Sequence, residues 1–214
     1  YVIAADGTTT PRNLTPGEFQ HNGIAWLADS SGIVTVSQRR DDWDISLGAD
    51  VLRVDLDETV TTLTELASTY AGPSVSPYGT MIAFVGTDNP LLYPQNVRVG
   101  VMAIDGSDRR WISEGLDRTF AAIGDPTPIW IDDATLLAAA EDRGQVHVYR
   151  LTVDGSMPKV LTDGALNVTG FGHRGGTFAT TRSTVSRTGE LFVERDGATE
   201  QVTSIGMTGS GWER

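Results

Sequence analysis

Val153-Asp154-Gly155, followed by Leu161-Thr162, is one copy of a pattern that recurs along the 214-residue chain. Each copy has a β-rich run, an acidic turn and a second run that ends in Leu-Thr or a similar pair. The other copies are Ala5-Asp6-Gly7 with Leu14-Thr15, Val54-Asp55-Leu56-Asp57 with Leu63-Thr64, Ile104-Asp105-Gly106 with Ile112-Ser113, and Arg195-Asp196-Gly197 with Val202-Thr203. The successive aspartates 6, 55, 105, 154 and 196 are 49, 50, 49 and 42 residues apart. A strand-rich period of roughly 40–50 residues is typical of β-propeller blades.

Two more apolar runs come before each full copy of the pattern, which gives every unit four short strands. The first runs are 23–26, 73–75, 128–130 and 168–171, and the second runs are 33–36, 81–84, 135–138 and 177–180. Asp-Gly between the third and fourth strands is a preferred hairpin turn, because both positions tolerate positive φ. Leu56-Asp57 replaces it in the second copy, so we expect a longer or different turn there.

The unit boundaries predict an all-β, partial β-propeller. Four full four-stranded antiparallel blades are expected at 23–66, 72–113, 127–162 and 168–203. Residues 1–16 match only the outer two strands of a blade, and 204–214, with Trp212, match the start of another. A generic β-sandwich is the alternative, but it does not require the same internal pattern at a fixed step. Because an open arc exposes apolar sheet faces, we expect self-association, or ring closure that brings residues 1–16 beside the tail.

Composition excludes several classes of function. The net charge is −12, which disfavours nucleic acid and anionic membranes as partners. No apolar run approaches the roughly 20 residues of a membrane span. The chain has no cysteine, so disulfides, thiolate metal sites and a cysteine nucleophile are absent. The start, Tyr1 to Gly7, lacks the basic lead and long apolar run of a signal peptide, and we expect a cytoplasmic protein.

Several motifs resemble those of known propellers. Ser76-Pro77-Tyr78-Gly79-Thr80-Met81-Ile82-Ala83-Phe84 resembles the S-P-x-G-x-x-I-A-F repeat of TolB-like propellers. The run 130–164 is similar to a blade of the prolyl oligopeptidase family, in its acylaminoacyl-peptidase branch. That run holds Glu141-Asp142-Arg143-Gly144, Val148-Tyr149-Arg150, Val153-Asp154-Gly155 and Leu161-Thr162-Asp163-Gly164. The resemblance implies a propeller that covers an α/β-hydrolase domain and limits access to its Ser-Asp-His site.

No catalytic or cofactor site is predicted within this chain. The G-x-S-x-G turn that presents a nucleophilic serine is absent, because Thr208 and Trp212 flank Gly209-Ser210-Gly211. His21, His147 and His173 have no ligand-type partner three or four residues away, so we expect no metal. Asp41-Asp42-Trp43-Asp44 lacks the spacing of a calcium loop and is interpreted as solvated charge.

The distribution of loop lengths predicts a binding face. The first-to-second and third-to-fourth links are short, whereas long links are expected at 39–50, 86–96, 113–126 and 182–189. Antiparallel order places the long links at one face, and insertions on one face mark the binding face of a repeat protein. The predicted contact residues there are Trp43, Leu91, Leu92, Tyr93 and Phe120. Arg143 is interpreted first as pairing to a neighbouring blade and second as facing substrate.

These expectations lead to two hypotheses of function. The first is the non-catalytic propeller portion of a serine peptidase, which admits short peptides to a hydrolase domain and excludes folded proteins. The alternative is a TolB-like protein-binding propeller with no peptidase attached. An in-frame α/β-hydrolase with G-x-S-x-G after Arg214 distinguishes them.

Overall fold

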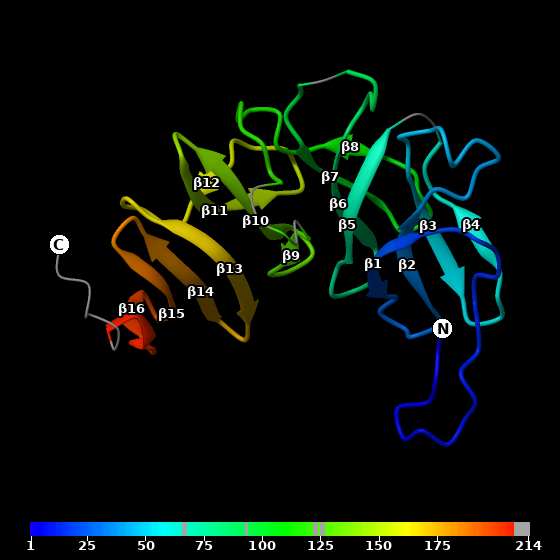
Figure 1. The fold of residues 1–214 in the computed structure, drawn as a ribbon, viewed down its shortest axis with the longest axis horizontal. Coiled ribbons are helices and arrows are strands. Elements are labelled where there is room, and N and C mark those ends of the chain that lie inside the picture. Colours follow the sequence, from blue (N-terminus) through cyan, green and yellow to red (C-terminus); the bar gives the residue numbers. More distant parts are fainter. Residues whose placement is uncertain (66–67, 93, 122–123, 125–126, 208–214) are drawn as a thin grey trace.

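The computed structural model describes residues 1–65, 68–92, 94–121, 124 and 127–207 (Figure 1). Within these residues the strands form four antiparallel groups of four, here called blades 1 to 4. Blade 1 consists of β1 (His21–Trp26), β2 (Gly32–Ser37), β3 (Asp50–Asp55) and β4 (Val60–Thr62), and blade 2 of β5 (Thr69–Val75), β6 (Met81–Thr87), β7 (Arg98–Ala103) and β8 (Arg110–Trp111). Blade 3 consists of β9 (Ile129–Trp130), β10 (Thr135–Asp142), β11 (Gln145–Thr152) and β12 (Lys159–Val160). Blade 4 consists of β13 (Asn167–Arg174), β14 (Thr177–Thr184), β15 (Arg187–Arg195) and β16 (Ala198–Gln201), and the 3-10 helix η1 (Ile205–Met207) follows it. The predicted all-β architecture of four-stranded antiparallel blades is confirmed.

The blades follow one another along an open arc (Figure 1). Consecutive strands are neighbours within every blade. A single parallel bridge between Val146 of β11 and Asn167 of β13 links blades 3 and 4, so hydrogen bonds connect them as one eight-stranded sheet. Residues 1–16 lie at the blade 1 end of the arc and η1 lies at the blade 4 end, so the described chain does not close into a ring.

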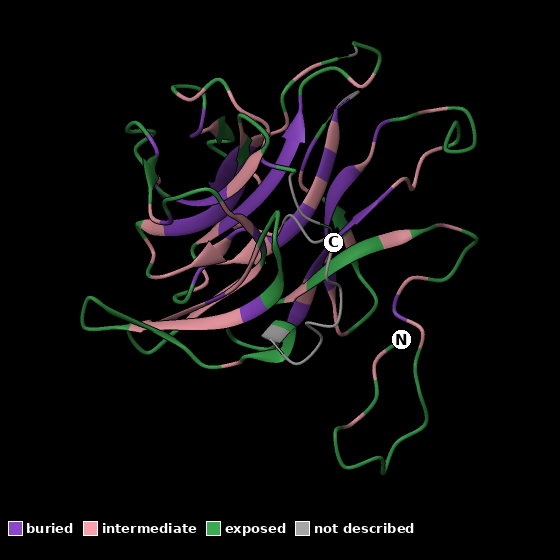
Figure 2. Cartoon of the chain, turned by 60° about the vertical axis from the view of Figure 1, so that its left-hand side comes forward, coloured by how far each residue is buried: buried purple, intermediate pink, exposed green. Residues whose placement is uncertain are grey.

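Along each central strand, successive side chains alternate between the two cores that lie on either side of its blade. In β6, Ile82 and Phe84 belong to the core between blades 1 and 2, and the intervening Ala83 belongs to the core between blades 2 and 3. In β10, Leu136 faces blade 2 and Leu137 faces blade 4. This follows from the two-residue period of a strand. Figure 2 shows buried residues running through the strands of the arc and exposed residues in its loops.

The recurring Leu-Thr pair extends the sheet beyond the short fourth strand. In blade 1, Leu63 donates its backbone N–H to the carbonyl of Val51 at 2.9 Å, and the Thr64 hydroxyl accepts the Val51 N–H at 3.0 Å. The same hydroxyl bond joins Val99 to Ser113 at 2.9 Å, Val148 to Thr162 at 3.1 Å and Leu191 to Thr203 at 2.9 Å. The hydroxyl satisfies a buried strand N–H that the fourth strand does not reach.

The repeated aspartate caps the turn between the third and fourth strands. Its Oδ1 accepts the backbone N–H two residues later at 3.0 Å, as from Ser107 to Asp105 and from Ser156 to Asp154. Hydroxyl hydrogen bonds, from Ser107 to Asp105 at 2.6 Å and from Thr152 to Asp154 at 2.5 Å, together with these backbone bonds hold the pKa of each carboxyl below its ordinary value. In blade 1 the capping residue is Asp57, and Glu58 takes the glycine position with φ of 75°. The expectation of a longer or different turn there was therefore wrong. The same turn forms in blade 1, with a non-glycine residue, Glu58, at the position of positive φ.

Blade 4 departs from the expected loop lengths. The segment 182–189, predicted as a long link, continues the β14–β15 hairpin, and only 185–186 separate the two strands. Val185 and Ser186 therefore form a tight turn that adds nothing to a binding face. Across the described residues, no helix is long and apolar enough to cross a membrane.

Candidate binding surfaces

The long links of blades 1 and 2 lie along one edge of the arc, the upper edge in Figure 1. We call residues 38–49, 88–92, 94–97 and 113–121 the loop face. Its β2–β3 link exposes Ile45 and Leu47, and its β6–β7 link exposes Leu91 and Leu92. We take these four exposed apolar side chains, from two loops of the same edge, as the candidate contact residues of the loop face. Leu91 and Leu92 were predicted from the sequence as contact residues, whereas Ile45 and Leu47 were not, although both follow the acidic cluster in the same loop.

Charged contacts hold the base of the loop face. Asp88 begins the β6–β7 link, accepts the indole N–H of Trp111 at 2.9 Å and pairs with Arg98. Arg98 also pairs with Glu114 at 2.8 Å (Nη1 to Oε1), and Glu114 lies in the next link of the loop face. Burial raises the pKa of Asp88, but the hydrogen bonds from Trp111 and Arg98 outweigh it and hold the pKa below its ordinary value.

Trp43 and Phe120, two of the predicted contact residues, have different surroundings. Trp43 is 38% exposed and packs edge-on against Phe19, with ring centroids 6.4 Å apart. Phe120 is buried in the core between blades 2 and 3, where its ring meets Tyr149 edge-on at 6.0 Å. Phe120 is therefore buried and does not lie on the surface on which the sequence placed it. Its backbone N–H donates to the Val97 carbonyl at 2.9 Å. Tyr93 lies outside the described residues.

Arg143 stands in the two-residue turn between β10 and β11. Arg143 and Gly144 both have positive φ, at 53° and 78°, and the Arg143 side chain is 88% exposed. The contact to the neighbouring blade comes instead from Asp142, whose Oδ1 lies 2.7 Å from Nε of Arg118. Arg118 belongs to the link after blade 2, so this ion pair joins blades 2 and 3. The prediction that Arg143 pairs to a neighbouring blade was therefore wrong, because Asp142 makes that contact.

The three histidines lie on three different strands. His147 is buried, with Nδ1 3.1 Å from the Thr162 hydroxyl and Nε2 2.9 Å from the Gln145 amide oxygen. His173 lies in β13, and His21 begins β1. In the part of the chain that the structure describes, no three histidine or acidic side chains converge as a metal site.

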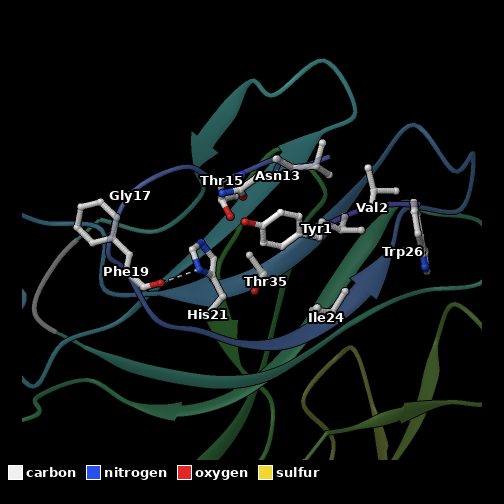
Figure 3. Close-up of a pocket in the computed structure, with 12 residues that line it drawn as sticks. Tyr1, Val2, Asn13, Thr15, Gly17, Phe19, His21, Ile24, Trp26 and Thr35 are labelled. Carbon is white, nitrogen blue, oxygen red and sulfur yellow. Dashed lines mark hydrogen bonds between the residues drawn. The ribbon is translucent and has the colours of Figure 1, made fainter. Parts of the chain in front are cut away.

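A pocket of about 380 Å³ lies between residues 1–17 and the outward side of β1 and β2 (Figure 3). Phe19, Ile24 and Trp26 supply its apolar walls, and Thr35 and His21 its polar ones. Nδ1 of His21 is 3.2 Å from the carbonyl of Phe19. Because a carbonyl only accepts, Nδ1 carries the proton and Nε2 is an acceptor. Burial lowers the pKa of His21, which keeps the ring neutral at pH 7.

Comparison with known proteins identifies the fold. No family model and no curated protein sequence matches the chain. Among solved structures, it is similar to a puromycin-hydrolyzing peptidase from Mycobacterium tuberculosis, with 19% identity, a TM-score of 0.74 and coverage of 94% of this chain and 33% of that one. It is also similar to the acylaminoacyl peptidase from Pyrococcus horikoshii (18%, 0.66, 89% and 28%) and to TolB from Acinetobacter baumannii (16%, 0.66, 93% and 47%).

The chain thus spans between about a quarter and a half of the length of these proteins. The similarity extends over nearly all of its own residues, in agreement with the succession of four-stranded blades described above. The chain has the β-propeller fold found in peptidases of the prolyl oligopeptidase family and in TolB.

Proposed function

We propose that this chain is a non-catalytic propeller portion that docks on an α/β-hydrolase domain and controls which peptides reach that domain's active site. The observation that supports it most is the loop face, where Ile45, Leu47, Leu91 and Leu92 are exposed along one edge of the arc. Solved peptidases with the same propeller fold are about three times as long as the portion matched here. Such a length leaves room for a partner domain. A cytoplasmic location is part of this proposal.

The arc suits a steric role. Its strands pack into continuous cores between the blades, so the loop face is held on a rigid scaffold rather than on a mobile segment. A propeller fixed over an active site admits extended short peptides and excludes folded proteins by size. Enclosure also keeps water from the reacting groups. The chain itself supplies shape and contact in this scheme, and the hydrolase domain supplies the nucleophile.

The proposal is tested by sequence and by turnover. The reading frame after Arg214 is expected to encode an α/β-hydrolase with G-x-S-x-G, and residues 1–214 alone are expected to show no turnover of aminoacyl or acyl-peptide reporters. In the full protein, Leu91→Asp with Leu92→Asp should weaken docking and raise hydrolysis of long substrates relative to short ones. Tyr78→Asp, at the opposite end of blade 2 and equally exposed, is the matched control.

A TolB-like protein-binding module without a peptidase is the second candidate. The Ser76-Pro77-Tyr78-Gly79 turn and the similarity to TolB over 93% of this chain favour it. A frame that encodes no hydrolase after Arg214 supports this candidate and contradicts the first. Turnover by residues 1–214 alone contradicts both.

A further inference from the structure

One face of the arc is only half covered. On the outward side of blade 1, Val2 and Leu14 pack over Leu52 and Val54 of the outer strand β3. Residues 2 and 12 are joined there by one antiparallel bridge. The inner strand β1 has no such cover: Ile24 is 68% exposed and Trp26 53%. The pocket of Figure 3 lies over this uncovered half.

The internal repeat shows what covers the equivalent position elsewhere. Trp26 pairs with Ile33 across β1 and β2, as Trp130 pairs with Leu136 across β9 and β10. In blade 3 this pair packs against blade 2, and the Trp130 indole N–H donates to the carbonyl of Ser74 in the inner strand β5 at 3.3 Å. The Trp26 indole N–H has no hydrogen-bond partner in the described chain, since no described strand lies over this face as β5 lies over Trp130.

Two buried polar atoms on the same face also lack partners. Thr35 is 1% exposed, yet its hydroxyl forms no hydrogen bond with any described residue. Nε2 of His21, an acceptor, is buried and equally unpaired, and Figure 3 shows it directed into the pocket. Buried polar atoms normally have partners, because an unpaired one costs about 1–3 kcal/mol. We therefore expect the occupant of the uncovered half to have hydrogen-bonding groups as well as apolar side chains.

We propose that this half-covered face is a docking site for a β-hairpin, the inner two strands of a further blade whose outer two strands are residues 1–16. The hairpin packs small apolar side chains on Ile24 and Ile33, as Ala83 and Val85 pack toward blade 3. Its inner strand offers a carbonyl to the Trp26 indole and a donor to Nε2 of His21. The Asp6-Gly7-Thr8 turn of residues 1–16, built like Asp105-Gly106-Ser107, supports this assignment.

The repeat also supplies a probe of defined sequence. Asp6 takes the place of Asp105, so Tyr1 takes the place of Gly100. A copy of residues 69–99 placed directly before Tyr1 therefore adds β5, β6 and their link in register, without a designed linker. In this copy Phe84 is replaced by Ala, because a side chain at the position of Gly100 would lie 2.5 Å from the Phe84 ring. Because the chain has no cysteine, Ile24→Cys creates a single thiol on the open face. Val185→Cys, in the exposed β14–β15 turn of blade 4, is the control thiol.

The rate of thiol labelling distinguishes the outcomes. With the added copy, labelling at position 24 should slow by at least about tenfold, which corresponds to a preference of about 1.4 kcal/mol for the covered state. Labelling at position 185 should not change. Ala83→Asp with Val85→Asp in the added copy alone should restore fast labelling at position 24, because charges on the packing face are not buried without a partner.

Three results would overturn the proposal. Labelling at position 24 that is unaffected by the added copy shows that the face does not accept a hairpin. Equal slowing by the doubly charged copy shows that packing is not specific. A chain without the copy that forms dimers by light scattering, with position 24 protected as concentration rises, shows that a second copy of this protein occupies the face instead.

Discussion

Removing the Phe84 ring should produce a large loss of stability, because this residue fills the core between blades 1 and 2. Phe84 is fully buried and meets Tyr70 and Trp111 edge-on, with ring centroids 5.3 and 5.6 Å away. Burial of such a side chain contributes about 1.5–3 kcal/mol, and each edge-on ring contact adds about 0.5–1.5 kcal/mol. Phe84→Ala should therefore lower the free energy of unfolding by about 3–5 kcal/mol, the range for Phe-to-Ala changes in cores.

Urea unfolding followed by both far-ultraviolet circular dichroism and tryptophan fluorescence measures this loss. Tyr78→Ala is the control, because the Tyr78 ring is exposed and should change stability by less than about 0.5 kcal/mol. The denaturant slope should stay the same, so that the shift in midpoint reports stability. A loss below about 1 kcal/mol for Phe84→Ala would refute face-to-face packing of blades 1 and 2.

Substitutions at three further positions test the local structure. Gly100→Ala places a methyl group 2.5 Å from the Phe84 ring and should cost about 1–3 kcal/mol in urea unfolding; an unchanged midpoint contradicts it. Thr162→Val removes the acceptor of the buried Val148 N–H and should cost about 1–3 kcal/mol, whereas Thr162→Ser should keep most of the stability. Hydrogen bonds from Thr203 and Gly206 hold the pKa of Glu190 below 4.5, so its stabilising effect is present above that value and is lost as pH falls through the lowered pKa. The melting temperature should therefore fall more steeply between about pH 6 and pH 3 for the natural chain than for Glu190→Gln. Parallel curves of melting temperature against pH would contradict this.

The repeat made most of the fold predictable, because each of its parts has a local physical cause. Asp105 and Asp154 cap turns by a bond within three residues, and Thr64 and Thr162 complete a ladder next to their own strand. Such local causes leave a pattern in the sequence. The turn at Asp57-Glu58 escaped the pattern, because a surrounding sheet forces positive φ on a residue that does not favour it.

The binding surface was less predictable, because exposure depends on contacts between distant segments. Phe120 looked like a loop residue, but its ring reaches Tyr149 of the next blade. Asp142, rather than Arg143, meets Arg118, and neither partner is marked by a local motif. The open pocket beside Trp26 was also not foreseen as a site, although the matching Trp130 could have signalled it.

The central claim is that neighbouring blades share one packed core, and a double-mutant cycle between Phe120 and Tyr149 tests it most directly. Phe120 follows blade 2 and Tyr149 belongs to blade 3, and their rings are 6.0 Å apart. With Phe120→Leu and Tyr149→Leu, alone and combined, urea unfolding should give a coupling free energy of about 0.5–1.5 kcal/mol. A coupling indistinguishable from zero would contradict the packing of blade 2 on blade 3.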